Sequence, residues 1–385
     1  MDFCSTRVLL TDGGARQTLT ILHGLKEIGC HVSVLCSSKY DVCYASKLPD
    51  NRILNENAAG SCDGFEDFLI TILSGGQYDV LVPVAEMTTN KVTQHEDEYR
   101  KFVKIACAPR KAYIQAANKQ NTFELAMKIG MPCPITRREG QSVEDFLGGV
   151  EFPVVIKPRF GMGSIGFHKF ERREDFWPYV REHRIDLDQY VLQQFIHFDK
   201  CFGAILFVDQ KNNVCMAYAD EVLRWFPIDA GTACLIRSID APELLKNAAN
   251  LLKAMNWRGV AALSFMMDKE DNIPKLQEIN GRIPASIKLS WQCGFNVAKL
   301  LVEMACDWDV EQYPDNTSFG LLTRHFHADL GWFIKSPQRF HADPSWFCWR
   351  NTKDVVYWKG DLKPWLAYTV RKLTGFQESV NKRRH

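Results

Sequence analysis

The stretch Glu151–Phe167 (EFPVVIKPRFGMGSIGF) constrains what this chain can fold into more than any other. A short apolar run between two prolines predicts a buried strand that ends near Lys157. The loop that follows contains Gly161, Gly163, Ser164 and Gly166. Glycines let backbone N–H groups approach an anion, and a lysine adds positive charge, so the stretch is typical of a phosphate site. An ordinary glycine hairpin after a core strand fits it equally well.

A second stretch, Lys275–Arg282 (KLQEINGR), carries candidate metal ligands. Glu278 and Asn280 are two residues apart on a predicted strand, so both side chains point to one face. A carboxylate and an amide oxygen are hard ligands suited to Mg²⁺, which usually keeps substrate phosphates in its shell. Arg282, two residues further on, is suited to clamp a phosphate or an acyl phosphate.

A lysine with a glycine loop, followed by Glu-x-Asn-x-Arg, is the order found in ATP-grasp ligases. The chain resembles that superfamily over roughly residues 5–308, in particular the branch related to the carbamoyl-phosphate synthase large subunit and the carboxylate–amine ligases. The resemblance implies ATP and Mg²⁺ as cofactors, with Mn²⁺ as an alternative metal. It also implies that Arg282 and Lys157 are catalytic and that Glu278 and Asn280 bind the metal.

The resemblance implies further nucleotide-binding residues. The pattern NKQNTFELAMKIGMPCP is similar to the opening of the family, which places Lys119 at an ATP phosphate; a surface lysine in a first helical turn is the alternative. Lys157 and the glycine loop complete the phosphate end. The adenine and ribose are expected at Gln193, Gln194, Phe195, Ile196 and Asp199. There the chain departs from the family, because glutamines replace a glutamate pair and the glycine turn is missing.

Two other departures concern the metal-bearing hairpin. Ser264 stands where relatives often place a further metal ligand, which puts more of the coordination on Glu278 or on another residue, Glu221 or Asp268. Gly281 stands where proline is common, which predicts a looser turn before Arg282.

Two interpretations stay open for each of two further groups of residues. Arg224 ends a predicted hairpin strand near a Gly-Thr loop, so it either grips a substrate carboxylate as a catalytic residue or pairs with Glu221. His325, His327 and Asp329 alternate on a predicted strand and therefore share one face. They either form a metal site or are ordinary strand side chains.

The expected fold class is α/β, with α+β character in the ATP-grasp part. We expect a Rossmann-like pre-ATP-grasp domain over residues 1–110. An ATP-grasp domain of two α+β subdomains clasping ATP would follow over 111–309, with a lid at 111–196 and a metal and substrate subdomain at 197–309. Residues 310–385 form an aromatic-rich C-terminal extension.

Composition limits the partners and the compartment. With hydrophobic residues at 46% and a net charge of +1 over 385 residues, the chain has no electrostatic feature that predicts nucleic acid or membrane binding. Thirteen scattered cysteines without zinc spacing indicate reduced thiols, and the N-terminus lacks a signal-peptide pattern, so we expect a cytoplasmic protein. Its partners would be small carboxylate and amine substrates, and a homo-oligomer is left open.

The function expected from these residues and the resemblance is an ATP-dependent, ADP-forming carboxylate–amine ligase that works through an acyl phosphate. Carboxyl phosphate or thioester formation on the same fold is one alternative. A non-catalytic nucleotide-binding protein is another, because Ser264 and Gln193 depart from the pattern. A dehydrogenase built on the Gly13–Gly14 turn is the third, although the turn lacks the full GxGxxG pattern.

Overall fold

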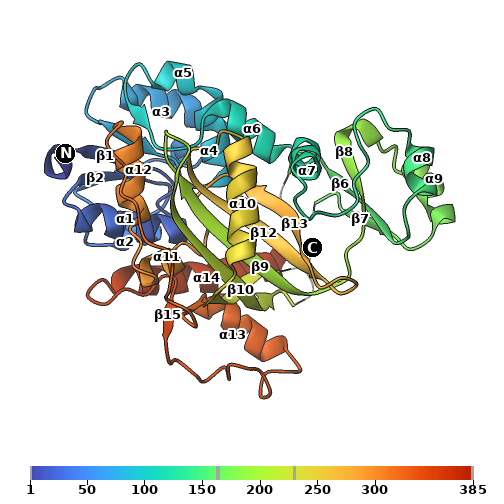
Figure 1. The fold of residues 1–385 in the computed structure, drawn as a ribbon. Coiled ribbons are helices and arrows are strands. Elements are labelled where there is room, and N and C mark those ends of the chain that lie inside the picture. Colours follow the sequence, from blue (N-terminus) through green and yellow to red (C-terminus); the bar gives the residue numbers. More distant parts are fainter. Residues whose placement is uncertain (1, 162–164, 229–230, 383–385) are drawn as a thin grey trace.

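The computed structural model describes residues 2–161, 165–228 and 231–382, with the backbone alone for 374–382. The described elements form a five-stranded, a seven-stranded and a three-stranded sheet, with helices packed around them (Figure 1). The predicted mixed α/β class is confirmed. In these ranges no helix combines the length and the apolar character that a membrane span requires.

The N-terminal part is a parallel sheet of order β3–β2–β1–β4–β5. Its strands are β1 (Arg7–Leu10), β2 (His31–Cys36), β3 (Asn51–Leu54), β4 (Val80–Val82) and β5 (Lys104–Ile105). All five strands are parallel, but the strand order changes sense between β1 and β4, because β2 and β3 lie on one side of β1 and β4 and β5 lie on the other. Open sheets of this kind place their sites beyond the carboxyl ends of the strands at such a point.

Helices cover both faces of this sheet because its strands are apolar on both sides. Val8 of β1 is buried with Leu19 of α1, whereas Leu9 is buried with Phe65 of α3. The helices are α1 (Arg16–Glu27), α2 (Val42–Ala45), α3 (Phe65–Leu73), α4 (Glu86–Gln94) and α5 (Glu96–Tyr99), with 3₁₀ turns at Phe3–Ser5 and Glu56–Ala58. Glu86 is the first residue of α4.

The lid is a small three-stranded antiparallel sheet that lies at one end of the molecule (Figure 1). Its central strand β6 ends in Lys157 and Pro158. The elements are α6 (Arg110–Ala117), α7 (Lys119–Lys128), α8 (Val143–Gly148), β6 (Val154–Pro158), β7 (His168–Phe170), α9 (Arg173–Glu182), a 3₁₀ turn (Leu187–Gln189) and β8 (Tyr190–Gln194). Asn118 is the predicted N-cap, since its side chain accepts from the N–H groups of Gln120 and Asn121.

The seven-stranded sheet has the order β13–β12–β9–β10–β11–β14–β15. Its strands are β9 (Phe198–Val208), β10 (Val214–Phe226), β11 (Thr232–Ile239), β12 (Gly259–Asp268), β13 (Pro274–Asn280), β14 (Leu322–Arg324) and β15 (Thr352–Asp354). Ile205 and Phe207 face the core shared with the first sheet, and Leu206 and Val208 face α10 (Pro242–Ala254). Both faces of β9 are covered from Ala204 to Val208, and this half of the strand is continuously apolar.

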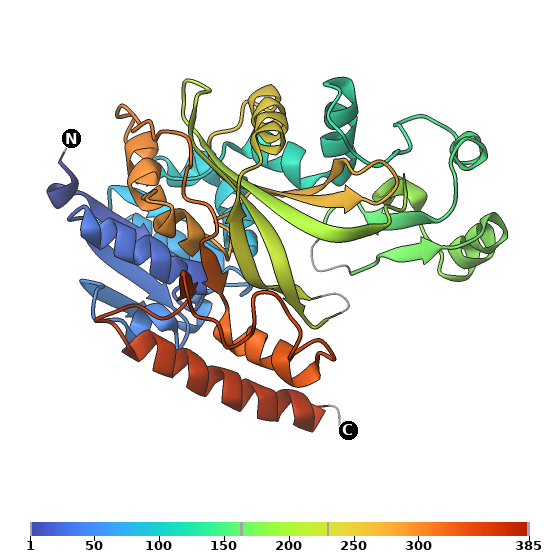
Figure 2. The same ribbon diagram turned by 60° about the horizontal axis from the view of Figure 1, so that its bottom comes forward.

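The C-terminal region is built into this body. The remaining helices are α11 (Lys288–Gln292), α12 (Val297–Ala305), α13 (Phe326–Lys335) and α14 (Lys363–Lys382). β14 and β15 extend the seven-stranded sheet, and α14 lies along the first domain with Arg371 3.0 Å from Asp41 (Figure 2). The strand predicted over His325–Asp329 is wrong, because helix α13 begins at Phe326.

Candidate nucleotide and metal site

Lys157 joins the lid to the body of the molecule. Its Nζ lies 3.5 Å from the carbonyl oxygen of Gln277 on β13 and 4.5 Å from the ring centre of Phe123 on α7. Burial lowers the pKa of Lys157 to about 7; the charge of Lys119 lowers it further, and that of Glu278 opposes the change. The lysine predicted on the lid therefore lies beside the strand predicted to hold the metal.

Lys119 holds the start of the glycine loop. Its Nζ donates to the carbonyl oxygen of Gly161 at 2.7 Å, and its backbone N–H donates to Arg159 at 2.9 Å. Gly161 has φ +128°, a conformation that favours glycine. Burial lowers the pKa of Lys119, and the charges of Glu278 and Glu86 oppose that shift. The predicted residues Gly163 and Ser164 lie outside the described ranges.

A chain of polar contacts runs from the metal-bearing strand to the first domain. Asn280 Nδ2 donates to Glu278 Oε1 at 3.2 Å, and Arg282 Nη2 donates to Asn280 Oδ1 at 3.4 Å. Arg282 Nε lies 3.5 Å from Oε2 of Glu86. The other oxygen of this carboxylate, Oε1, accepts a hydrogen bond from the Tyr113 hydroxyl at 3.0 Å. The two-residue spacing of the sequence thus places these side chains on one face.

The donor set fits Mg²⁺ that shares its shell with a nucleotide. Within the described ranges, no group of three or more His, Cys, Asp or Glu residues is arranged to hold a metal on its own. Glu278 and Asn280 supply one carboxylate and one amide, and Mg²⁺ commonly takes one or two carboxylates and completes its shell with phosphates and water. Ser264 pairs directly with Glu278 across β12 and β13, so its hydroxyl is carried by the strand next to the proposed metal ligands.

Packing holds the turn before Arg282 in place. A Cβ on Gly281 would lie 2.7 Å from Trp257 and 3.2 Å from Tyr113, so a glycine is needed to fit against two buried rings. The expectation of a loose turn is wrong, because this contact packs the turn tightly. Burial lowers the pKa of Arg282, while Glu86 and Glu278 oppose the shift.

The residues predicted to hold the base and ribose follow the lid strand β8. Gln193 is buried and donates from Nε2 to Thr136 Oγ1 at 2.6 Å, so its side chain already has a partner. The N–H groups of Gln194 and Phe195 donate to backbone carbonyls at 2.9 Å. Ile196 is buried and Asp199 is exposed. Nucleotide contacts at these five positions stay a prediction.

Arg224 lies in a different group of residues. Its guanidinium is 2% exposed, pairs with Asp329 at 3.1 Å and donates to the carbonyl of Pro344. Glu221 pairs with Arg237 at 2.6 Å, so the predicted Glu221–Arg224 pair is wrong. This geometry lends no support to a substrate-gripping role for Arg224.

The Gly13–Gly14 turn is closed by the C-terminal helix. The N–H of Gly13 donates to the carbonyl of Leu35 at 2.8 Å, and Arg371 Nη1 donates to the carbonyl of Gly14 at 3.3 Å. A Cβ on Gly14 would lie 2.6 Å from Asp41 Oδ1. These contacts favour the structural interpretation of the turn over a dinucleotide site.

The sequence reasoning missed residues that reach the site from other elements. Arg16, the first residue of α1, contacts the carbonyl of Ala285 at 3.4 Å and His325 Nδ1 at 3.3 Å. The positive charge of Arg16 contributes to the lowered pKa of Arg282. Phe123 and Tyr113 approach from helices α7 and α6. They carry no local motif, and the long-range packing that brings them here is absent from the sequence pattern.

Parts of this chain are similar to known proteins. Residues 116–286 match the model of the ATP-grasp domain. The carbamoyl phosphate synthase large chain of Vibrio parahaemolyticus is 23% identical over 238 residues, which are 57% of this chain and 22% of that protein. The chain therefore spans about a fifth of the length of the curated relatives it matches.

Solved structures show the same fold. A biotin carboxylase complex with β,γ-ATP from Campylobacter jejuni has a TM-score of 0.69 at 16% identity, covering 82% of this chain and 73% of that one. The biotin carboxylase domain of Hydrogenobacter thermophilus 2-oxoglutarate carboxylase, a dimer with MgADP, ADP and bicarbonate, also has a TM-score of 0.69, at 13% identity, with the same coverage of both chains. The chain contains an ATP-grasp domain and is homologous over part of its length to the carbamoyl phosphate synthase large chain.

Proposed function

We propose that this protein is an ADP-forming carboxylate–amine ligase that activates its acid as an acyl phosphate. The observation that carries the proposal is the approach of Lys157 to β13, where Nζ lies 3.5 Å from Gln277 O and close enough to Glu278 for their charges to interact. This proximity supports a site in which Lys157 would contact the nucleotide phosphates and Glu278 would hold the metal.

The chain's own residues supply charge and alignment, which is what phosphoryl transfer requires. Lys119 and Lys157 would neutralise the nucleotide phosphates, and Lys119 also fixes the loop at Gly161. Arg282 is held by Asn280 and Glu86 beside the metal ligands, where it would stabilise the charge on the acyl phosphate. Glu278 and Asn280 would hold a Mg²⁺ ion, which would supply positive charge to the phosphates during transfer.

The pKa of Lys157 gives a prediction about nucleotide binding. In the free protein this pKa is about 7, so the amine is largely neutral above that pH. Phosphates raise the pKa again, so ADP binding at about pH 8 should take up a proton, and its affinity should fall as the pH rises further. Calorimetry in buffers of different ionisation enthalpy measures the uptake. Lys157→Met should abolish it; wild-type binding without proton uptake would contradict the assignment.

The experiment that tests the function is ADP release with Mg²⁺ and ATP, screened against pooled amino acids, small carboxylates and amines. The expected result is ADP release that needs both an acid and an amine. Lys157→Met and Glu278→Gln are the inactive controls. ATP binding without ADP release in any pool would instead favour a non-catalytic nucleotide-binding protein.

Carboxyl phosphate formation is the second candidate. It is favoured by the fold shared with the biotin carboxylase domain that was solved with MgADP and bicarbonate. Bicarbonate alone would then support ADP release by this protein. A requirement for an organic acid would exclude this candidate, and a requirement for a thiol acceptor would instead indicate thioester formation.

A further inference from the structure

Residues 330–373 carry a surface that combines apolar and basic side chains, here called the basic–apolar surface. Its apolar members are 49–66% exposed: Ile334, Phe340, Phe347, Leu362, Leu366 and Leu373. The stretch holds eight lysines and arginines against three aspartates, a net charge of +5 where the whole chain has +1. Two of those aspartates, Asp354 and Asp361, are buried. The near-neutral whole-chain charge therefore hides a strongly basic region.

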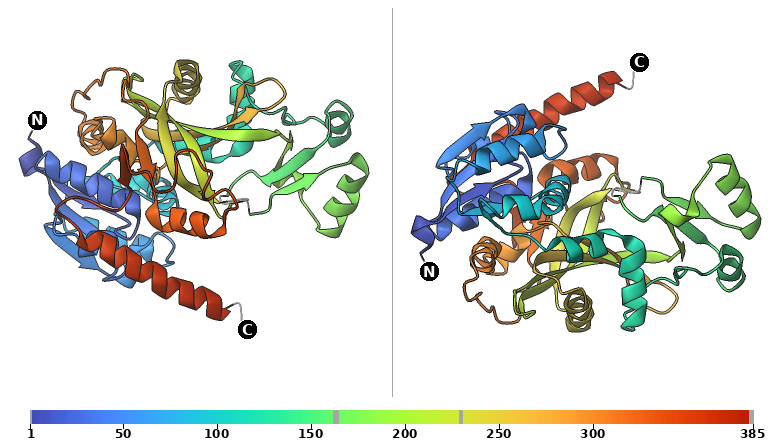
Figure 3. Two further views of the ribbon diagram at one scale, coloured as in Figure 1. Left: turned by 90° about the horizontal axis from the view of Figure 1, so that it is seen from below. Right: turned by 90° about the horizontal axis from the view of Figure 1, so that it is seen from above.

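The elements that carry this surface lie together on one side of the molecule. α13 and α14 are side by side, because His325 Nε2 lies 3.1 Å from the Tyr368 hydroxyl and His327 Nε2 lies 2.8 Å from Thr369 Oγ1. Seen from below, both helices face the viewer, and the C-terminal part of α14 extends past the other elements (Figure 3). Leu366 and Leu373 are seven residues apart and therefore lie on one face of α14, and Leu362 directly precedes the helix.

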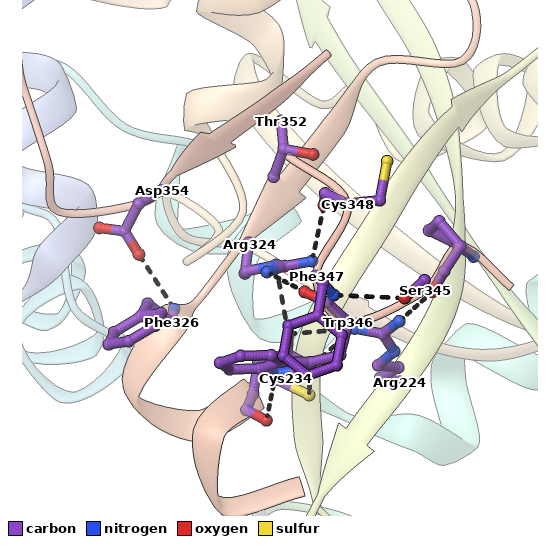
Figure 4. Close-up of polar contacts among 12 residues, drawn as sticks. Arg224, Cys234, Arg324, Phe326, Ser345, Trp346, Phe347, Cys348, Thr352 and Asp354 are labelled. Atoms are coloured by element: carbon purple, nitrogen blue, oxygen red, sulfur yellow. Dashed lines mark hydrogen bonds and ion pairs between the residues drawn. The ribbon is translucent and has the colours of Figure 1, made fainter. Parts of the chain in front are cut away.

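Buried arginines hold the loop of this surface in a fixed shape. Arg324 donates to the carbonyls of Trp346 at 2.9 Å and Cys348 at 3.2 Å, on either side of the exposed Phe347 (Figure 4). The Trp346 indole donates to the carbonyl of Asp329 at 3.1 Å. Because this loop is already held in one conformation, its exposed side chains lose little conformational entropy when they bind a partner.

The charge and the kind of apolar side chain indicate what this surface contacts. A second copy in a two-fold dimer would bring the same basic patch against itself, and like charges would repel. Single-stranded nucleic acid binds mainly by stacking on aromatic rings, whereas four of the six apolar members of this surface are aliphatic and only Phe340 and Phe347 are aromatic. Basic residues interleaved with exposed aliphatic and aromatic side chains suit the boundary between anionic headgroups and acyl chains.

We propose that the basic–apolar surface docks the protein on an anionic lipid surface, with α14 lying in the plane of the interface. The apolar side chains of α13, α14 and the loop around Phe347 enter the headgroup boundary. Lys335, Lys359, Lys363 and Lys372, which are exposed, meet the anionic headgroups. Such docking does not depend on the ligase proposal.

The test is co-sedimentation of the full chain with vesicles. Binding should be strong to phosphatidylcholine vesicles containing about one third phosphatidylserine, weak to phosphatidylcholine alone, and reduced by salt. Lys335→Glu with Lys363→Glu should weaken binding at least about tenfold. Phe340→Ser with Phe347→Ser should do the same without changing the thermal unfolding, because both rings are exposed.

Matched controls change exposed residues elsewhere. Lys101→Glu with Lys269→Glu, and Tyr40→Ser, should leave vesicle binding as in the wild type. Equal sedimentation with and without anionic lipid, or none at all, would overturn the proposal. It would also be overturned if Phe340→Ser with Phe347→Ser abolished a dimer of the protein instead of vesicle binding.

Discussion

Replacing Glu278 with glutamine should lower ADP release by about 10²–10³-fold while the protein stays folded. The substitution keeps the size of the side chain and its contact with Asn280 Nδ2, which lies 3.2 Å from Oε1. It removes the negative charge that the proposed metal needs and that faces Lys119 and Lys157. Steady-state ADP release with the substrates found in the screen, together with thermal unfolding, measures both parts of the prediction.

Glu270→Gln is the matched control for this experiment, because Glu270 is an exposed carboxylate in the turn of the same hairpin. It should keep the wild-type rate. A Glu278→Gln variant that turns over at the wild-type rate would show that this carboxylate is no metal ligand.

Removing the carboxylate of Asp329 should destabilise the protein by about 3–5 kcal/mol. Asp329 is fully buried and lies 3.1 Å from Arg224 Nη1 and 3.2 Å from Arg324 Nε, and both arginines are almost fully buried. Asp329→Ala leaves two guanidinium groups without their counter-charge in a low-dielectric environment. Urea unfolding followed by tryptophan fluorescence reports on this region, since Arg224 stacks on Trp332 and Arg324 on Trp349.

Asp343→Ala is the control, because Asp343 is an exposed carboxylate of the same segment. Its effect should stay within about 0.5 kcal/mol. An unfolding transition that is the same in Asp329→Ala and the wild type would mean that the pair contributes little, and that other packing holds α13 in place.

Local sequence pattern predicted the elements whose residues depend on near neighbours. The apolar run His31–Cys36 is strand β2, and the Asn-Asn turn at 212–213 joins β9 to β10 as expected. Asn118 caps α7 because a short polar side chain before a helical pattern satisfies free N–H groups.

Contacts between distant segments could not be predicted in the same way. His325 and Asp329 are four residues apart, a spacing that fits one face of a strand and one turn of a helix equally well. Residues 326–335 form the helix α13, and this helix places Asp329 against Arg224, which is 105 residues earlier in the chain. Likewise, Glu86 of α4 meets Arg282 through the packing of segments far apart in the sequence, and no motif around Glu86 signals that contact.

The candidate site shows the same division. Lys157, Glu278, Asn280 and Arg282 were recognisable because spacing along one strand or one loop carries their chemistry. Arg16, Tyr113 and Phe123 come from helices whose faces are set by tertiary packing. The basic–apolar surface was hidden for a related reason, because net charge averages over the chain whereas a binding surface depends on where the charges gather.

The central claim is that Lys157 and Glu278 hold a single triphosphate between them. A crystal structure of the full chain with Mg²⁺ and a non-hydrolysable ATP analogue tests it most directly. We expect phosphate density between Lys157 Nζ and the Glu278 carboxylate, with the metal touching Glu278 and Asn280. A nucleotide bound elsewhere, or a triphosphate that contacts neither residue, would contradict the account.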